Sequence, residues 1–450
     1  MSNSILNVAM NGLLVGEWRK LTSGATEFQY AEKWLESVRS RPISLSLPLS
    51  HKIYRGDSVY NFFDNLLPDN EQIRSRIQQR FQTSTKSPFD LLSAIGQDCI
   101  GAIQLYQGQS HSVRQIYAEP LNDKEVENVL KNYRTFPLGM EEREDFRISL
   151  AGAQEKTALL YYQNQWQRPL HSTATSHIFK LPIGMVAQGQ LDLSGSCENE
   201  WLCLNIMKAF GLSVPRSQIQ YFGEMKVLIV ERFDRRWSEN RSWLIRLPQE
   251  DMCQALNIAP ARKYENDGGP SILQIMSLLN GSSNAQADRK QFFKAQIVFW
   301  LLCAIDGHGK NFSLFLEQEN RYRLTPFYDV MSAYPLIKHN GLQKQKVKMA
   351  MAWHGENKHY LWDKIQLRHI FNTAKLAGLA KETVEDILHK LCALYPRVSE
   401  INTHGLPDEI VEPIFMGLEM QMKKLKKCGG NSPYFLIAEK KKRRRNRRFL

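Results

Sequence analysis

The sequence predicts an α+β protein in which short strands dominate the first half of the chain and helices dominate the second. A two-residue turn signal, Asn11-Gly12, joins the apolar runs Ile5–Met10 and Leu13–Trp18, which is typical of a β-hairpin. Between residues 146 and 235, β-rich runs surround one helical pattern. Beyond Pro248 apolar residues recur mainly at helical spacing.

The first part of the chain, residues 1–105, is expected to form a small β-rich unit with its own core. Thr26–Tyr30 is a plausible third strand, and strict alternation from Ile43 to Leu49 predicts a half-buried fourth strand. Helices are expected between Tyr60 and Pro68 and over Phe89–Ala94, because apolar residues recur there at i, i+3 and i+4.

Two further units and a tail are predicted after it. Residues 106–235 form an α/β lobe, with strands over 157–162, 177–181, 218–222 and 226–233 and a helix over 199–210. Residues 236–435 form a helical lobe, with helices over 271–280, 286–305, 364–377 and 381–394. Residues 436–450 are a basic tail that is expected to be disordered.

The composition indicates a soluble protein of a reducing compartment, so the expected location is the cytoplasm. Seven scattered cysteines in 450 residues show no C-x-x-C spacing, and no apolar run reaches the length of a membrane span. The net charge is +13, of which the segment Lys440–Arg448 supplies eight basic residues. A solvated end, a nucleic-acid contact and a nuclear signal remain open readings of that segment.

The strongest chemical pattern is Asp306-Gly-His-Gly-Lys-Asn311, directly after a buried helix, Phe292–Ile305. The five-residue separation of Asp and Asn matches the catalytic loop of protein kinases. There the carboxylate orients the attacking hydroxyl and the amide oxygen holds magnesium. Gly307 and Gly309 are expected to allow a tight turn. An ordinary polar turn between a helix and a strand explains the string equally well when it is taken alone.

A second carboxylate follows at the expected place. Asp329 ends Thr325-Pro-Phe-Tyr-Asp and comes after a predicted hairpin, Phe312–Leu316 and Arg321–Leu324. A kinase carries its second metal-binding carboxylate just beyond such a hairpin. The alternative is an aspartate that caps a turn. The order of the two motifs favours metal chemistry.

Upstream residues supply candidates for phosphate binding. Ala151, Gly152 and Ala153 lie in a small-residue loop whose backbone N–H groups are suited to phosphate oxygens. Lys180 lies in a strand, and Glu200 opens the following helix, so the pair is expected to lie together as in kinases. A plain turn and two surface charges are the alternatives.

The segment Val230-Glu-Arg-Phe233 ends a strand where the chain passes between the lobes. Its backbone is expected to meet adenine, and Asp234 is expected to reach ribose hydroxyls. A charged strand end is the alternative.

Taken together, these strings resemble the HipA family. The resemblance covers residues 5–400 and is carried by FFDNLLPD, ISLAGAQEK, HIFKLP, NEWLCL, VERFDRR, RLPQEDMCQAL, KYENDGGP, DGHGKNFS and LTPFYD. It implies a bilobal protein-kinase-like fold and a serine/threonine kinase toxin that uses ATP and Mg²⁺. It also implies phosphorylation of glutamyl-tRNA synthetase, growth arrest and persistence, a HipB-like helix-turn-helix antitoxin dimer, and operator DNA bound through that complex.

The resemblance also assigns roles to individual residues. Asp306 matches the catalytic aspartate, Asn311 and Asp329 match the magnesium ligands, and Ser149 matches the autophosphorylated serine. Glu200 supports Lys180, and Lys364 and Arg368 are candidate DNA contacts. The expected nucleotide-binding residues are Ala151, Gly152, Ala153, Gln154, Glu155, Lys156, Lys180, Glu231, Arg232, Phe233, Asp234, His308 and Lys310.

Two other functional classes stay open on the residues alone. A kinase of a small molecule or lipid is one, because the usual His-Arg pair is missing before Asp306. A catalytically idle, DNA-associated corepressor is the other. It would be expected to have lost site residues, whereas Ser149, Lys180, Asn311 and Asp329 all keep competent side chains.

Overall fold

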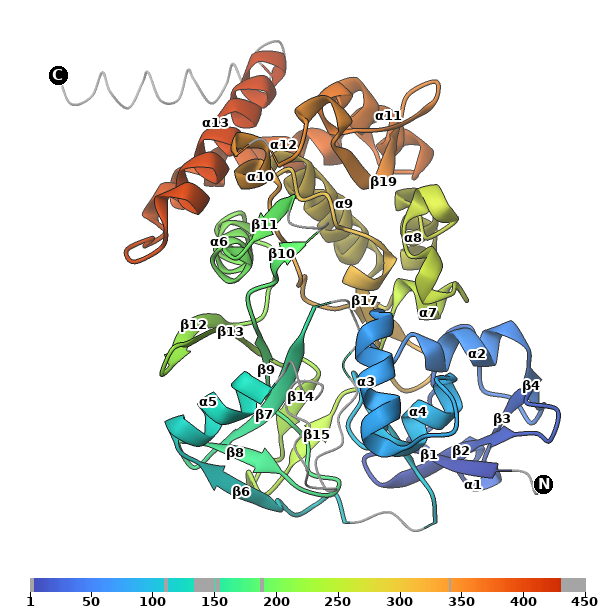
Figure 1. Ribbon diagram of the computed structural model, residues 1–450. Helices are drawn as coiled ribbons and strands as arrows, with labels where there is room; N and C mark the ends of the chain where they lie inside the picture. Colours follow the sequence, from blue (N-terminus) through green and yellow to red (C-terminus); the bar gives the residue numbers. More distant parts are fainter. Residues whose placement is uncertain are drawn as a thin grey trace.

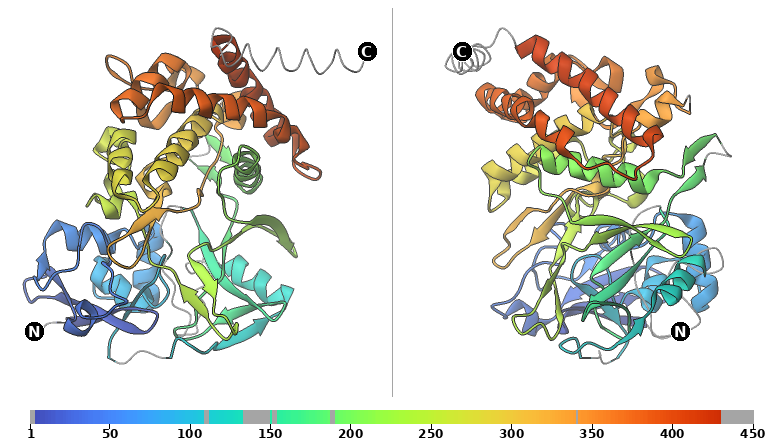
Figure 2. Two further views of the ribbon diagram at one scale, coloured as in Figure 1. Left: turned by 180° about the vertical axis from the view of Figure 1, so that it is seen from behind. Right: turned by 90° about the vertical axis from the view of Figure 1, so that its left-hand side faces the viewer.

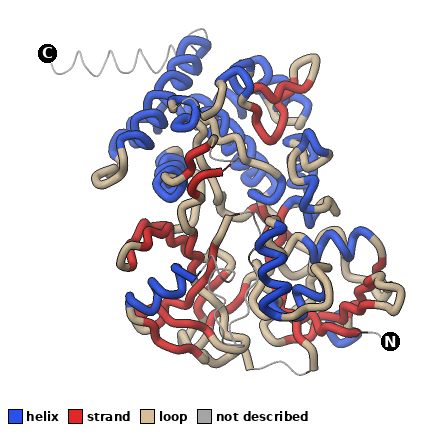
Figure 3. Tube along the Cα trace, viewed as in Figure 1, coloured by secondary structure: helices blue, strands red, loops and turns tan. Residues whose placement is uncertain are grey.

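The computed structural model describes residues 4–108, 112–132, 150, 154–186, 190–339 and 341–429. Two sheet-containing parts lie side by side, and a mainly helical part covers both (Figure 1). Figure 3 shows the same division, with most strands in the lower half of the view and most helices in the upper half. The views from behind and from the side keep this arrangement (Figure 2). The predicted α+β architecture with a β-rich beginning and a helical end is therefore confirmed.

The N-terminal part contains an antiparallel five-stranded sheet of order β4-β3-β2-β1-β5. Its strands are β1 (Ser4–Met10), β2 (Leu13–Lys20), β3 (Thr26–Tyr30), β4 (Tyr54–Arg55) and β5 (Ile103–Tyr106). Its helices are α1 (Glu32–Leu35), α2 (Asp57–Asp64), α3 (Glu71–Phe81) and α4 (Pro88–Ile95). Asn11 and Gly12 adopt positive φ angles of 49° and 77°, which confirms the predicted hairpin turn.

The predicted strand from Ile43 to Leu49 is wrong, since this segment contains only an isolated bridge between Ser44 and Leu47. Side chains, not a neighbouring strand, bind its backbone. The Tyr30 hydroxyl donates to the Leu47 carbonyl and accepts from the Ile43 amide. Leu45 N–H donates to Glu250 at 2.9 Å. The alternating pattern indicates which residues are buried but does not fix the backbone conformation. Here the buried residues belong to a loop that folds back.

The middle part contains a six-stranded sheet of order β12-β13-β9-β7-β8-β6. Its strands are β6 (Ala118–Leu121), β7 (Lys156–Tyr162), β8 (Gln165–Pro169), β9 (His177–Lys180), β12 (Ser217–Phe222) and β13 (Met225–Glu231). Helix α5 (Asp123–Lys131), helix α6 (Ser196–Ala209) and the hairpin of β10 (Gly184–Val186) and β11 (Leu191–Leu193) accompany it.

Alternation along these strands decides which side chains reach the site. Phe179 and Ile229 lie opposite each other and belong to a core shared with the N-terminal part. Lys180 lies opposite Leu228 and so projects from the other face, where Leu228 packs with the start of α6. The register of β9 therefore directs Lys180 towards α6.

The C-terminal part carries three short sheets and most of the helices. Its strands are β14 (Arg235–Trp237), β15 (Leu244–Arg246), β16 (Gln249–Asp251), β17 (Ser313–Leu316), β18 (Tyr322–Leu324), β19 (Lys348–His354) and β20 (Lys358–Leu361). Its α-helices are α7 (Met252–Ala255), α8 (Ile272–Leu278), α9 (Ala285–Leu301), α10 (Tyr334–Lys338), α11 (Leu367–Leu376), α12 (Lys381–Leu394) and α13 (Asp408–Gly429).

Helix α9 is the centre of this part. Every residue from Phe292 to Leu301 is buried, because other elements surround the helix. A helix that is buried on every side has little freedom to move, so the position of its C-terminal end is fixed. The loop that begins at Asp306 follows directly, and the predicted hairpin after it is confirmed as β17 and β18. Within the described ranges, no helix is long and apolar enough to cross a membrane.

Candidate active site

A cavity of about 400 Å³ lies where the three parts meet. It gathers predicted site residues that are spread over more than 170 positions of the sequence. Those that line it are Gln154, Lys156, Lys180, Glu200, Glu231, Arg232, Phe233, Asp234, Asp306, His308, Lys310, Asn311 and Asp329. Ser149 and Ala151–Ala153 lie outside the described residues, as does the tail from residue 430.

Lys180 is held between two carboxylates. Its Nζ lies 2.7 and 2.9 Å from the two oxygens of Glu200 and 2.7 Å from Asp329 Oδ1. Burial opposes the charge of Lys180, but Asp329 and Glu200 outweigh it and raise the pKa above the ordinary lysine value. The pKa of Asp329 is lowered, since Lys180 and Lys156 outweigh its burial. The lysine is therefore charged and fixed in place.

Two hydrogen bonds to the Asp306 carbonyl hold the catalytic-loop candidate in its conformation. Asn311 Nδ2 donates to the Asp306 carbonyl at 2.7 Å, and the His308 amide donates to the same carbonyl at 2.8 Å. Neither Gly307 nor Gly309 adopts a positive φ. They are needed for space instead, because a Cβ on Gly309 would lie 2.5 Å from Pro270, and one on Gly307 would lie 2.6 Å from Phe299.

The Asp306 carboxylate faces the cavity with half of its side chain exposed, at 50%. Its Oδ1 accepts a hydrogen bond from the Tyr264 hydroxyl. Desolvation raises the pKa of Asp306, and the bond from Tyr264 offsets part of that rise. His308 packs edge-on against Tyr264, and burial lowers its pKa to about 3, so its imidazole is neutral at pH 7.

Asn311 and Asp329 fit the requirements of a magnesium ion, which prefers oxygen ligands. The protein orients Asn311 through its amide nitrogen, and one Asp329 oxygen carries the bond from Lys180. Both residues line the cavity. Asp329 has a φ of 60°, a left-handed conformation that aspartate tolerates better than most residues.

Part of the cavity lining is apolar. This part, called the apolar slot below, is suited to a flat ring and consists of Ile178, Ile183, Val186, Val230 and Met331. In the hinge, the Glu231 amide donates to Arg216 O and the Arg232 amide donates to Ser176 O, both at 2.9 Å. Among the amides from Glu231 to Phe233, the expected donor to adenine is therefore Phe233 N–H.

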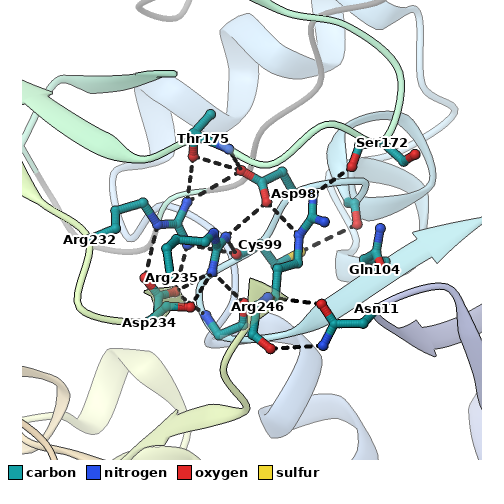
Figure 4. Close-up of polar contacts among 12 residues, drawn as sticks. Asn11, Asp98, Cys99, Gln104, Ser172, Thr175, Arg232, Asp234, Arg235 and Arg246 are labelled. Atoms are coloured by element: carbon teal, nitrogen blue, oxygen red, sulfur yellow. Dashed lines mark hydrogen bonds and ion pairs between the residues drawn. The ribbon is translucent and has the colours of Figure 1, made fainter. Parts of the chain in front are cut away.

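Asp234 lines the cavity, so its contact with a ribose stays a prediction, and its carboxylate is also bound by groups of the protein. Asp234 Oδ1 accepts from Arg232 Nε at 3.0 Å, and Oδ2 accepts from Arg232, Arg235 and the Gly101 amide at 2.7 to 2.8 Å. Figure 4 shows these groups in a buried cluster with Asp98. The side chains of Arg232 and Asp234 therefore join the N-terminal part to the hinge.

The described ends of the predicted phosphate loop are anchored. Leu150 is buried in the shared core, and Gln154 Nε2 donates to Leu181 O. Glu155 forms an ion pair with Arg76. Lys156 lies opposite Lys180 in the sheet, and desolvation together with Lys180 lowers its pKa to about 8.

The two candidate DNA contacts lie away from the cavity. Lys364 is 64% exposed beside Asp363, and Arg368 is exposed on α11 with its Nε 3.3 Å from His369 Nε2. Both are accessible to a partner.

Sequence reasoning gave no role to several polar residues that line or face the cavity, among them Asn65, Asp69, Lys263 and Tyr264. The family-like strings contain all four of these: FFDNLLPD includes Asn65 and Asp69, and KYENDGGP includes Lys263 and Tyr264. The two strings could have indicated a role for these residues, but their position beside Asp306 is apparent only from the folded structure.

Comparison with known proteins identifies the family of the chain. Residues 6–106 match the model of the HipA N-terminal domain, and residues 148–398 match that of the HipA-like C-terminal domain. Y4mE of Sinorhizobium fredii, a protein with the provisional name of a kinase, is 32% identical over 343 residues, covering 74% of this chain and 79% of Y4mE. The serine/threonine-protein kinase toxin HipA of Shewanella oneidensis is 26% identical over 339 residues, covering 73% of this chain and 75% of the toxin.

A solved structure shows the same fold. It is the HipA, HipB and operator DNA complex of the Shewanella oneidensis toxin–antitoxin system, with a TM-score of 0.76 and 22% identity. The match covers 94% of this chain and 97% of the other. The chain therefore belongs to the HipA family of kinases and contains both the N-terminal and the C-terminal domain of that family.

Proposed function

We propose that this protein is a bacterial serine/threonine kinase toxin that transfers the γ-phosphate of Mg-ATP to a protein hydroxyl. The observation that carries the proposal is the convergence of Lys180, Glu200, Asp306, Asn311 and Asp329 on one cavity. In kinases these residue types hold the phosphates, brace the lysine, orient the hydroxyl and bind magnesium, in that chain order.

Each group would have a definite task in the transfer. Adenine would enter the apolar slot, and the Lys180 ammonium would bind phosphate oxygens while Glu200 keeps it in place. Asp306 would accept the proton of the attacking hydroxyl as its oxygen bonds to the γ-phosphorus and the bond to ADP breaks. Asn311 and Asp329 would hold magnesium, which neutralises phosphate charge when bound.

The family substrate, glutamyl-tRNA synthetase, is the proposed target, and Ser149 is the proposed site of autophosphorylation. Growth arrest and persistence would follow from inhibited translation. The relatives support the proposal, since one is named a serine/threonine-protein kinase toxin. The test is phosphorylation of a bacterial lysate by the purified protein with labelled Mg-ATP, followed by mapping of the phosphosites. Label confined to a small molecule or lipid, or no transfer at all, would refute the proposal.

A HipB-like antitoxin dimer is the proposed partner, and operator DNA would be bound through the complex. The support is the Shewanella oneidensis structure, which contains HipA, HipB and operator DNA. Lys364 and Arg368 are exposed and suited to phosphate contacts, and the basic segment 440–448 would add to them. Deleting residues 440–450 should reduce the salt dependence of operator binding by the complex. An unchanged dependence would exclude a DNA role for this segment.

A further inference from the structure

Asp69 belongs to the N-terminal part of the chain, in the connection between α2 and α3, yet its carboxylate lies in the cavity. Its Oδ2 lies 2.9 Å from the Nζ of Lys263, and its Oδ1 lies 3.1 Å from the Nζ of Lys310. Lys310 is part of the loop that begins at Asp306. One carboxylate from outside the kinase lobes thus bridges two ammonium groups inside the site.

Asn65 adds to the same contact. Lys310 Nζ donates to the carbonyl of Asn65 at 3.1 Å and to its Oδ1 at 3.0 Å. Lys310 is only 6% exposed, and the nearest carboxylate of the C-terminal part, that of Asp251, lies at 3.9 Å. The close partners that hold this ammonium therefore come mainly from the N-terminal part.

The connection that carries Asp69 is itself fixed. Arg74 Nε donates to the Pro68 carbonyl at 2.6 Å, and its Nη1 donates to Asp64 at 2.6 Å. Asn65 Nδ2 donates to the Ile258 carbonyl at 3.0 Å, across to the C-terminal part. The connection that carries Asp69 is therefore held in place by hydrogen bonds.

The two lysines are also linked to Asp306. The Gly309 amide donates to the Lys263 carbonyl at 3.1 Å, and Tyr264, the next residue, donates to Asp306. Burial opposes the charge of Asp69, but Lys310 and Lys263 outweigh it and lower its pKa to about 2. Asp69 is therefore ionised at neutral pH, between the side chains of Lys263 and Lys310.

We propose that Asp69 is a positioning residue for phosphoryl transfer, which fixes the ammonium groups of Lys263 and Lys310 at the Asp306 end of the cavity. This inference rests on the proposed kinase function. Negative charge moves to the γ-phosphate oxygens and the leaving group during transfer, and fixed cations lower the barrier only when they are already in place. The N-terminal domain is then an integral part of the active centre.

The effect should fall on kcat, because the ATP-anchoring groups are elsewhere. Lys180 and the apolar slot stay intact when the Asp69 carboxylate is removed. Asp69→Asn in the full-length chain should lower kcat at least ~10-fold while the KM for ATP changes less than about threefold. Asp69→Glu, which keeps the charge but displaces it, should lose less.

Asp90→Asn is the matched control. Asp90 also belongs to the N-terminal part and is ion-paired at 2.7 Å, but its partner is Lys20 and it does not line the cavity. It should lower the melting temperature without changing kcat per folded molecule. Asp69→Asn should lower kcat by a smaller factor in a Lys310→Met background than in the wild type, since part of the effect of the carboxylate is exerted through that lysine.

The outcomes separate the two proposals. Absence of phosphoryl transfer by the wild-type protein refutes the kinase function and this inference with it. An active wild type with kcat of Asp69→Asn within twofold refutes the inference alone. Equal losses of kcat in Asp69→Asn and Asp90→Asn, or a loss confined to KM, also refute it. If Asp69→Asn does not fold, the kcat of Asp69→Glu decides, and a wild-type value refutes the positioning role.

Discussion

The ammonium of Lys180 donates to both carboxylate oxygens of Glu200, at 2.7 and 2.9 Å. Strand β9 supplies the lysine and helix α6 supplies the glutamate, and both side chains are almost completely buried. A buried charge is tolerated only when a partner compensates it. The pair is therefore in place before a nucleotide arrives.

Lys180→Met should lower phosphoryl transfer by at least ~100-fold, because the cation that binds phosphate oxygens is lost. It should also destabilise the protein by about 3 kcal/mol, since Glu200 would remain buried without its partner. The measurements are initial rates with labelled ATP and urea unfolding. Glu200→Gln should keep ATP binding within about tenfold and lower the rate, because Lys180 retains Asp329. Full activity of the Lys180→Met variant would show that Lys180 is not part of the active site.

Asp306→Asn and Asp329→Asn should each reduce transfer by at least ~10³-fold, for different reasons. Asp306→Asn removes the group that accepts the hydroxyl proton, so Mg-ATP binding should be unchanged. Asp329→Asn removes a magnesium ligand and a partner of Lys180, so the magnesium dependence of ATP binding should weaken. Titration calorimetry of ATP binding at two magnesium concentrations distinguishes the loss of the proton acceptor from the loss of the magnesium ligand. Loss of binding in Asp306→Asn would place its carboxylate on the metal.

The parts of the site that were predictable from sequence are local in the chain. Asp306 and Asn311 are five residues apart in one loop, and Asp329 follows one hairpin later. Lys180 and Glu200 were also recoverable, because a strand followed by a helix fixes their order. In each case the spacing of the residues along the chain is enough to predict that their side chains lie close together.

The failures have physical causes. The segment from Ile43 to Leu49 was expected to form a strand because its apolar residues alternate, but it is a loop whose backbone is bound by the side chains of Tyr30 and Glu250. Asp69 was not assigned a role, since its contact with Lys310 joins residues about 240 positions apart and no local pattern reports it. Long-range ion pairs become visible only when the fold is known.

Glu250 should make stability depend on pH. It is completely buried, and burial raises its pKa to about 8, despite the hydrogen bonds from Ser44 and Leu45. The folded state then holds a proton that the unfolded chain releases above about pH 4.3, so stability should fall as pH rises from about 4.3 to 8.

Glu250→Gln mimics the neutral carboxyl and removes that dependence. The variant should be as stable as the wild type near pH 5 and more stable by about 2–4 kcal/mol at pH 8. Urea unfolding at both pH values measures it. An equal pH dependence in the two proteins would show that Glu250 is ionised when folded.

Tyr264 should control the pH at which the enzyme loses activity on the acid side. Its hydroxyl donates to Asp306 Oδ1 and stabilises the ionised carboxylate, which offsets part of the rise in pKa caused by desolvation. The reaction needs Asp306 ionised, so activity falls as pH drops through its pKa. Tyr264→Phe removes the donor, raises that pKa further and should move the acid limb of kcat/KM to higher pH, with a loss of about tenfold at pH 7.

Tyr328→Phe provides the control, because Tyr328 also lines the cavity but donates to the Lys310 carbonyl at 2.9 Å and does not contact Asp306. Its pH profile should keep the wild-type acid limb even if the rate falls. The profiles are measured with saturating magnesium, so that metal binding does not move with pH. If Tyr264→Phe lowers the rate equally at every pH, the hydroxyl positions Asp306 without setting its pKa. If both variants shift the limb alike, the shift comes from a general loosening of the cavity and not from the hydrogen bond to Asp306.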